Sequence, residues 1–356
     1  MKIQENIPLA PLTTFQVGGP ARYLTEARSE RDVQDCVAYA AERGLPLFVL
    51  GGGSNLVVAD TGFPGLVLKI GLSDVKVQDN GVLQAAAGQN WDACVALAVN
   101  MNYAGIECLS GIPGTVGGTP VQNVGAYGQE VSQTIIRVRV LELETRKIVD
   151  LDHAACGFAY RTSIFNTSQR GKHIVLEVAY RLKPGGAPSI QYADVKKFFA
   201  DAGISSPTLQ QVRDAVRSIR QSKAMLIVAG DEDCRSAGSF FKNPVVSLAE
   251  ADRVEALARQ RVPGKALPRY PAQDGKVKLA AAWLVEHSGF NKGYSRGPVG
   301  ISRKHSLAIV NRGGAKAGDI MALKDEVQKK VFDVWGVELH PEPVFVGFAQ
   351  EGGKQG

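Results

Sequence analysis

Two glycine-rich segments are the features of this 356-residue chain that point most directly to chemistry. Residues 51–55 read Gly-Gly-Gly-Ser-Asn, and residues 110–128 contain six glycines and two prolines in nineteen positions. Such a composition makes neither a good helix nor an ordinary strand. Because glycine has no side chain, a ligand can lie directly against its backbone. Both segments are therefore candidate ligand-binding loops.

The first glycine loop lies between two apolar runs, residues 47–50 and 56–58, which are typical of extended chain. It matches neither the G-x-G-x-x-G of a Rossmann turn nor the G-K-[ST] of a P-loop. A glycine-rich turn can still bind an anion through its backbone N–H groups, without a helix behind it. A plain connection between strands is the alternative for this loop alone.

Taken together, the two loops indicate one extended ligand, with phosphates at the first loop and a flat ring at the second. That is the shape of FAD, which we predict to be bound noncovalently. The candidate FAD-binding residues are Gly51, Gly52, Gly53, Ser54, Asn55, Ser110, Gly111, Ile112, Pro113, Gly114, Thr115, Gly117, Gly118, Asn123, Gly125, Ala126 and Tyr127.

Three short motifs elsewhere carry candidate catalytic residues. Arg161 lies in Phe-Ala-Tyr-Arg-Thr-Ser-Ile-Phe, Ser239 follows Ser-Ala-Gly and precedes two phenylalanines, and Glu342 stands between two prolines. Each motif has a structural alternative: a strand end with an exposed arginine, a piece of apolar core, and a surface turn. A planar guanidinium suits a carboxylate, and proline holds a neighbouring carboxylate stiffly.

These motifs, in this order, resemble the UDP-N-acetylenolpyruvoylglucosamine reductases. The resemblance begins at Pro-Leu-Thr-Thr-Phe-Gln-Val-Gly-Gly-Pro-Ala, residues 11–21, and ends at Glu342. Pro-Ser-Ile-Gln-Tyr at 188–192 resembles the extra tyrosine loop of a longer subgroup. The implied fold is α+β: a two-part FAD-binding domain of the vanillyl-alcohol-oxidase type and a smaller α+β substrate-binding domain. The implied boundaries are 1–70 and 71–207 for the two FAD-binding subdomains, 208–330 for the substrate-binding domain, and 331–356 for a segment returning to the active site.

The resemblance implies NADPH-dependent reduction, through FAD, of the enolpyruvyl group of UDP-N-acetylglucosamine enolpyruvate to UDP-N-acetylmuramate. In this scheme Arg161 and Glu342 stabilise the charge that develops at the carboxylate end, and Ser239 donates a proton to carbon. The implied setting is the cytoplasm and peptidoglycan precursor synthesis, and hence cell-wall biogenesis, cell shape, cell division and the cell cycle.

Four further positions match substrate-binding residues of that family. The implied contacts are Tyr192 closing over the nucleotide, Lys223 and Asn243 at the UDP end, and His287 where some relatives have glutamine. The apolar segment 224–234 departs from the family's Lys-Leu-Pro pattern. The alternative function is another FAD-dependent oxidoreductase of the alcohol-oxidase type on the same fold, many of which hold flavin covalently through histidine or cysteine.

Composition sets further expectations. The net charge of +6 mildly favours anionic small ligands, but no basic stripe with interleaved aromatic residues indicates nucleic-acid binding. The basic stretch 213–223 is expected to be a solvated helix face. The N-terminus has no apolar signal core, no run is long enough to span a bilayer, and the five scattered cysteines suggest neither a metal site nor disulfides. We expect a monomer.

Hydrophobic periodicity and capping signals predict the local structure. The expected helices span 29–44, 90–101, 206–223, 279–287 and 319–335, the third with Pro207 at its first position. The expected strands span 47–50, 66–70, 82–87, 135–143, 174–182, the region near 299, and 307–310. The polar tail after Phe348 is expected to fray.

Overall fold

The computed structural model describes residues 2–348. The chain divides into two compact units. Unit 1 comprises residues 21–53 and 64–227 with the N-terminal residues up to 7, and unit 2 comprises residues 8–20, 54–63 and the residues from 228 onward. The boundary within the first glycine loop falls between Gly53 and Ser54. Two short N-terminal segments therefore pack with the C-terminal half of the chain.

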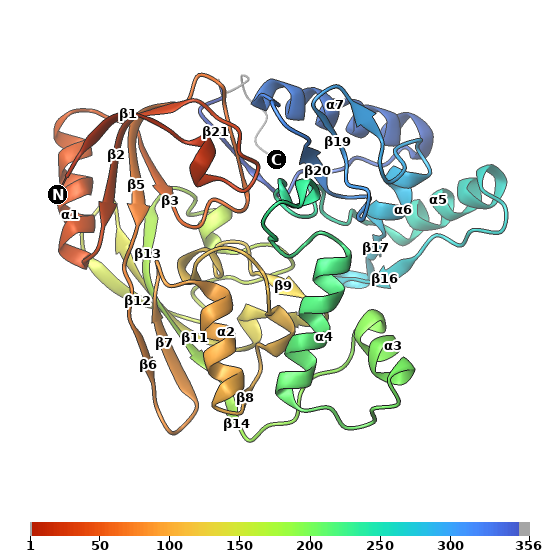
Figure 1. The fold of residues 1–356 in the computed structure, drawn as a ribbon, viewed down its shortest axis with the longest axis horizontal. Helices are drawn as coiled ribbons and strands as arrows, with labels where there is room; N and C mark the ends of the chain where they lie inside the picture. Colours follow the sequence, from red (N-terminus) through yellow and green to blue (C-terminus); the bar gives the residue numbers. More distant parts are fainter. Residues whose placement is uncertain (1, 349–356) are drawn as a thin grey trace. The chain divides into compact units, whose positions relative to one another are not determined.

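Unit 1 is built on two sheets and four helices (Figure 1). One sheet has the order β1-β2-β5-β3 and the other the antiparallel order β12-β11-β13-β7-β6. The helices are α1 Glu30–Glu42, α2 Trp91–Asn100, α3 Ala193–Asp201 and α4 Leu209–Ser222. The strands of the two sheets are β1 Gln4–Pro8, β2 Pro20–Ala27, β3 Leu47–Leu50, β5 Phe63–Ile70, β6 Val75–Val77, β7 Val82–Ala86, β11 Ile135–Glu142, β12 Ile148–Asp152 and β13 His173–Arg181. Two small two-stranded sheets pair β8 Tyr103–Ala104 with β14 Lys183–Pro184 and β9 Gly125–Ala126 with β10 Gln129–Glu130.

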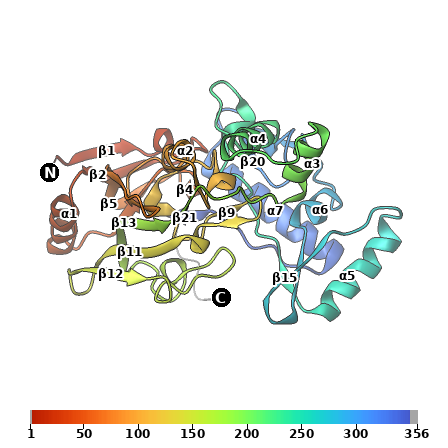
Figure 2. The same cartoon turned by 90° about the horizontal axis from the view of Figure 1, so that it is seen from below.

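One apolar core joins both sheets of unit 1 to helices α1 and α2. Strand β13 is buried on both of its faces, since Ile174, Leu176 and Val178 and also the intervening Val175 and Ala179 are buried. Strands β11, β12 and β13 lie side by side in Figure 2. The second glycine segment contributes Val116 to this core, so the packing of the core fixes where that segment runs.

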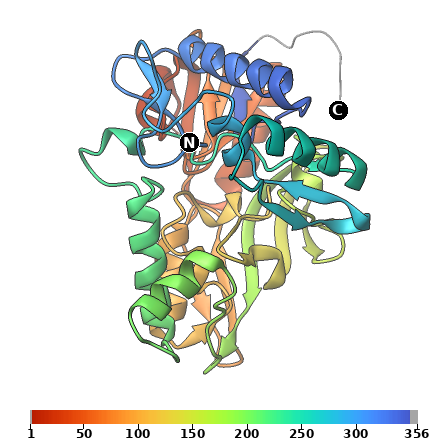
Figure 3. The same ribbon diagram turned by 90° about the vertical axis from the view of Figure 1, so that its right-hand side faces the viewer.

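Unit 2 packs its longest helix against small sheets. Its helices are α5 Leu248–Arg261, α6 Ala281–Glu286 and α7 Ala317–Trp335, and α7 is the blue helix along the top of Figure 3. Its strands are β4 Leu56–Val58, β15 Val245–Val246, β16 Arg269–Pro271, β17 Val277–Leu279, β18 Ser295–Arg296, β19 Val299–Ile301, β20 Ile309–Asn311 and β21 Val344–Val346. Strand β21 pairs in parallel with β4, so residues 344–346 lie beside the strand that follows the first glycine loop.

Most local predictions are confirmed, because capping and periodicity act within a few residues. Ser29 and Asp32 form the predicted capping box of α1, and Asn90 caps α2. The predicted start of α4 is wrong: Thr208, not Ser206, is the N-cap, and Pro207 lies outside the helix. Val334 on α7 is only half-buried, whereas Trp335 is fully buried. The tail after Phe348 lies outside the described residues.

Candidate functional site

The two glycine segments meet within unit 1. A Cβ added at Gly52 would lie 2.5 Å from Cα of Gly114, and one added at Gly51 would lie 2.9 Å from Oγ1 of Thr115. A side chain at position 52 would force the two backbones apart. The first loop therefore needs glycine in order to approach the second, whatever it binds.

The second segment holds glycines of two kinds. Gly111 and Gly114 have φ of +72° and +124°, which a residue with a side chain rarely adopts, and a Cβ at Gly117 would lie 2.7 Å from Cβ of Ala87. Gly118 has no protein atom within 4 Å of the position its Cβ would take. Backbone conformation explains Gly111 and Gly114, and packing explains Gly117. Neither explains Gly118, where a ligand could occupy the open space.

Arg161 is held against the end of the second glycine segment. Its Nη2 donates to the carbonyl oxygen of Gly125 at 2.5 Å, and its backbone has a φ of +54°. The buried side chain of Asn123 donates to the carbonyl oxygen of Ala159 and to a carboxylate oxygen of Glu130, both at 3.0 Å. The motif carrying Arg161 and the predicted FAD-binding segment are thus connected by hydrogen bonds within unit 1.

A second group in unit 1 brings predicted cofactor and substrate residues together. The rings of Tyr127 and Tyr192 meet edge to face with centroids 5.4 Å apart, and Tyr192 is exposed at the N-terminus of α3. Lys223, at the C-cap of α4, forms an ion pair with Asp194 two residues beyond Tyr192. Burial raises the pKa of Tyr127 above its usual value. The predicted tyrosine and lysine therefore lie on neighbouring helices, visible side by side in Figures 1 and 3.

The expectation that residues 213–223 form a solvated helix face is wrong. Arg213 and Arg220 are buried, and Arg217 is half-buried. Asp92 on α2 accepts two hydrogen bonds from Arg213, at 2.6 and 3.0 Å, and one from Arg217. Its carboxylate also accepts the backbone N–H of Gly111 at 2.6 Å. Asp92 thus ties α4 to the second glycine segment, and the i, i+4, i+7 spacing of the three arginines was the sequence signal for a shared face.

Two opposing effects set the charge of Asp92. Burial raises its pKa, but the hydrogen bonds from Arg213 and Gly111 and the nearby guanidinium charges outweigh burial, so its pKa lies below the usual value. The carboxylate is therefore ionised at neutral pH.

Arg220 offers an anion-binding group beside the second glycine segment. Its Nη2 donates to the carbonyl oxygen of Met225 at 2.6 Å, but its buried Nε has no hydrogen-bond partner among the residues that the structure describes. That nitrogen lies 3.4 Å from the position a Cβ at Gly111 would take. Burial lowers the pKa of the guanidinium below its usual value. An orphaned donor at this place fits an anionic ligand.

The remaining predicted residues lie in unit 2, where Asn55, Ser239 and Glu342 come together through backbone pairing. Nδ2 of Asn55 donates to the carbonyl oxygen of Glu342 at 3.2 Å, and the N–H of Val344 donates to the carbonyl oxygen of Asn55 at 2.9 Å. The N–H of Glu342 donates to the carbonyl oxygen of Phe240 at 2.8 Å. Ser239 and Glu342 are therefore on adjacent extended segments, with Asn55 on the far side of Glu342.

Other predicted residues of unit 2 have structural partners. Ser54 accepts through its carbonyl oxygen from Thr14 at 3.4 Å. Oδ1 of Asn243 accepts the N–H of Ala281, the first residue of α6, at 2.9 Å. The ring of His287 stacks on Trp283 with centroids 4.1 Å apart. These contacts give Asn243 and His287 structural roles, and their predicted substrate contacts stay predictions.

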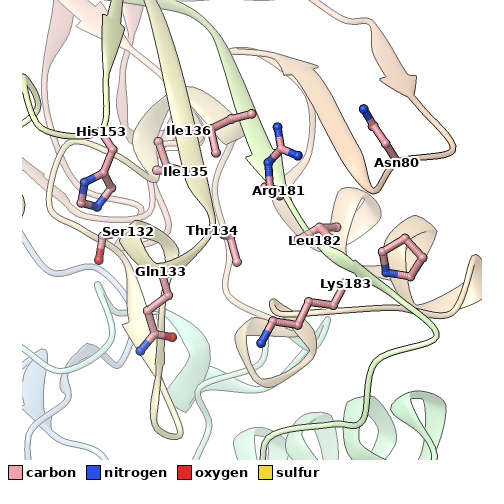
Figure 4. A pocket seen from close by; sticks show the side chains of 11 residues that line it. Asn80, Ser132, Gln133, Thr134, Ile135, Ile136, His153, Arg181, Leu182 and Lys183 are labelled. Atoms are coloured by element: carbon pink, nitrogen blue, oxygen red, sulfur yellow. The ribbon is translucent and has the colours of Figure 1, made fainter.

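A pocket of about 840 Å³ opens on unit 1, and no predicted site residue lines it (Figure 4). Arg181, Lys183, His153 and Thr134 are among the residues that line it. In residues 2–348 no group of three side chains could hold a metal ion, and no helix there is long and apolar enough to cross a membrane. All five cysteines are buried free thiols.

Comparison with known proteins identifies the class and then the family. Residues 21–152 match the model described as "FAD binding domain", which places the chain among proteins built on that domain. Residues 230–346 match the model described as "UDP-N-acetylenolpyruvoylglucosamine reductase, C-terminal domain".

Relatives and a solved structure agree along the whole chain. The reductase of Thermobifida fusca is 46% identical over 96% of this chain and 97% of its own, and that of Streptomyces avermitilis is 43% identical over 96% and 94%. The crystal structure of the Thermus caldophilus reductase has the same fold, with a TM-score of 0.68, 24% identity and coverage of 97% and 99%. The chain belongs to the UDP-N-acetylenolpyruvoylglucosamine reductase family, and its predicted α+β fold is confirmed.

Proposed function

We propose that this protein is the FAD-containing, NADPH-dependent enzyme that reduces UDP-N-acetylglucosamine enolpyruvate to UDP-N-acetylmuramate in peptidoglycan precursor synthesis. The observation that carries the proposal is identity above 40% along nearly the full length of two reductases. The alcohol-oxidase alternative would have to explain why the C-terminal half also matches the reductase model.

The residues of unit 1 fit a flavin dinucleotide. Gly118 leaves open space, Gly111 and Gly114 expose backbone in conformations that favour glycine, and Arg220 has an unsatisfied donor beside them. Residues 51–55 would hold the diphosphate, and residues 110–118 and 123–127 would hold the ring. When bound, FAD accepts reducing equivalents from NADPH and delivers hydride to the substrate.

The protein's own side chains would control charge and protons. The Arg161 guanidinium would bind the carboxylate of the enolpyruvyl group and stabilise the negative charge that develops there. Glu342 would polarise the same end of the substrate. The Ser239 hydroxyl would then give its proton to the second carbon of the former double bond. Support for the last two roles is the backbone pairing that places residues 239 and 342 on adjacent segments.

Substrate binding would use the exposed ring of Tyr192 as a cover for the nucleotide. The ammonium group of Lys223 would bind the diphosphate, either in place of Asp194 or together with it. Asn243 would act at the UDP end, and His287 would contact the substrate, both from positions already fixed by α6.

The remaining features of the proposal concern the whole chain. We propose that the functional domains end at residues 70, 207 and 330. We also propose that the protein is a monomer, that it acts in the cytoplasm, and that it contributes through the cell wall to cell shape and division. The packing units do not define these functional boundaries, since α4 packs in unit 1 while the proposed substrate domain begins at residue 208.

The cofactor assignment is tested by spectroscopy of the purified protein. We expect a yellow protein whose flavin is released in full by denaturation and is bleached by NADPH without oxygen. Flavin that stays attached after denaturation would favour the covalent-oxidase alternative. A protein that remains colourless when incubated with FAD would exclude both assignments.

A further inference from the structure

The hydroxyl of Ser239 has a titratable partner. Nε2 of His305 lies 3.1 Å from Oγ of Ser239. A backbone hydrogen bond holds the two segments together, because the N–H of Phe240 donates to the carbonyl oxygen of Leu307 at 2.8 Å. Residues 239–240 and 305–307 are therefore adjacent segments of unit 2. No sequence motif had drawn attention to His305.

The turn that carries His305 is held by its own hydrogen bonds. The N–H of His305 donates to Oγ of the buried Ser302 at 3.3 Å, and its carbonyl oxygen accepts the N–H of Ala308 at 3.1 Å. Ser302 and Ala308 are buried, whereas His305 itself is half-buried. The imidazole thus has a fixed position and retains access to protons from solvent.

A serine hydroxyl that protonates carbon needs its proton replaced. Its own pKa is far above neutral, so a bare alkoxide left behind would be costly. An imidazolium is the side chain best able to supply a proton near neutral pH. A hydrogen bond from Nε2 to Oγ also leaves the hydroxyl hydrogen free to point toward a substrate.

We propose that His305 is a positioning and proton-relay residue that acts through Ser239. As the Oγ–H bond of Ser239 breaks and a C–H bond forms on the substrate, the Nε2–H bond of the His305 imidazolium breaks and a new Oγ–H bond forms. The imidazolium loses its positive charge as the substrate loses its negative charge, and His305 regains a proton from solvent. This inference rests on the proposed function.

Charged groups around the His305 turn set the field at the imidazole. Lys304 forms an ion pair with Asp231 from the segment before the Ser239 motif, and the N–H of Arg303 donates to Asp233 at 3.4 Å. From α6, Glu286 accepts the hydroxyl of Ser306. Glu342 lies on the segment paired with Phe240. The guanidinium of Arg303 is also 3.8 Å from Glu232, so acidic partners accompany both basic residues of the turn.

The test separates the two half-reactions by stopped-flow without oxygen, on the full FAD-loaded chain. His305→Gln keeps a side chain able to hydrogen-bond but has no proton to transfer. We expect its reduction by NADPH to stay normal and its reoxidation by the enolpyruvyl substrate to slow by about a hundredfold. His305→Ala should show the same defect, and added imidazole should restore part of the rate. His153→Gln, at an exposed histidine of unit 1, is the matched control and should behave as wild type.

Each outcome bears on a different claim. Normal reoxidation of His305→Gln, or a His305→Ala defect that imidazole does not relieve, would overturn the relay and leave the proposed function standing. Wild-type flavin that NADPH reduces but the enolpyruvyl substrate cannot reoxidise would overturn the proposed function, and the relay with it.

Discussion

At the scale of single residues, Ser239 carries the sharpest consequence of the proposed chemistry. Ser239→Ala removes the hydroxyl but leaves Phe240 and its backbone hydrogen bonds in place. Flavin binding and reduction by NADPH should be unchanged. Reoxidation by the enolpyruvyl substrate should slow by roughly a hundred- to ten-thousand-fold, the usual loss for a positioned general acid. Stopped-flow of the separate half-reactions measures this, and normal reoxidation would remove Ser239 from the mechanism.

Two glycines of the predicted FAD site separate ligand contact from protein packing. Gly118→Ala meets no protein atom within 4 Å, so the stability of the flavin-free protein should change by less than about 0.5 kcal/mol. If FAD lies against this position, its affinity should fall about tenfold or more. Gly52→Ala clashes with the Gly114 backbone and should destabilise the flavin-free protein by about 1–3 kcal/mol.

Calorimetric unfolding and FAD titration of both variants decide between these effects. Unchanged FAD affinity in Gly118→Ala would place the flavin elsewhere. An unchanged melting temperature in Gly52→Ala would show that the two loops can separate freely.

The residues of the site were predictable to different degrees. Arg161, Ser239 and Glu342 stand in distinctive local motifs, so the sequence could single them out. His305 and Asp92 could not be found in this way, because their importance comes from partners 66 residues away at Ser239 and 121 residues away at Arg213. For Asn243 the sequence motif could be recognised, but the hydrogen bond that its side chain accepts from Ala281 could not be predicted.

At the scale of elements, the ion pairs of Asp92 connect helices α2 and α4. Asp92→Asn leaves the buried Arg213 without its counter-charge, and the free energy of unfolding at neutral pH should fall by about 3 kcal/mol. Asp35→Asn, which breaks an exposed pair with Arg31, should cost less than about 0.5 kcal/mol. Equal effects of the two substitutions would contradict a special role for Asp92.

Because the pKa of Asp92 is lowered in the folded protein, the stabilisation by its ion pairs depends on pH. The ion pairs stabilise the protein above the ordinary aspartate pKa of about 3.9, and the contribution is lost as pH falls through the lower value of the folded protein. Urea unfolding of both proteins at neutral pH and at about pH 3 measures this contribution. The free energy of unfolding of the wild type should approach that of Asp92→Asn at the lower pH. If the difference in unfolding free energy between the wild type and Asp92→Asn were the same at both pH values, the charge of Asp92 would not be its cause.

Tyr192 tests whether the N-terminus of α3 covers the substrate. Tyr192→Phe keeps the ring that meets Tyr127 and loses only the hydroxyl. We expect the KM for the enolpyruvyl substrate to rise by up to about tenfold, the loss of one hydrogen bond, while reduction by NADPH stays near normal. Tyr270→Phe, at an exposed tyrosine of β16, is the control. Equal damage to both half-reactions would contradict the proposed cover.

Several helices with strong local signals were predicted well, but α5 was missed although Ser247 and Glu250 form a capping box at its start. Other errors arose where tertiary contacts decide. The capping box of α1 involves residues only three positions apart and needed no further context. The basic face of α4 was misjudged because an arginine is usually exposed, and the partner that offsets the burial of Arg213, Asp92, lies on another helix.

At the scale of the whole molecule, the division of the chain could not be predicted from local pattern. Residues 8–20 and 54–63 pack with the C-terminal half, and β21 pairs with β4. Beside this pairing, the side chain of Asn55 donates to the carbonyl oxygen of Glu342, 287 positions away. The pairing of β21 with β4 depends on packing between distant segments, which periodicity does not record. The consequence is that two parts of the predicted site, Asn55 and Glu342, are joined within one unit.

The most direct test of the proposed function is a single anaerobic cycle of the wild-type protein. NADPH is added until the flavin is fully bleached, excess is removed, and UDP-N-acetylglucosamine enolpyruvate is added in amounts equal to the flavin. The account predicts full recovery of the oxidised flavin spectrum, with one UDP-N-acetylmuramate formed for each flavin. Flavin that stays reduced until oxygen or an alcohol-derived product is supplied, with no UDP-N-acetylmuramate formed, would contradict it.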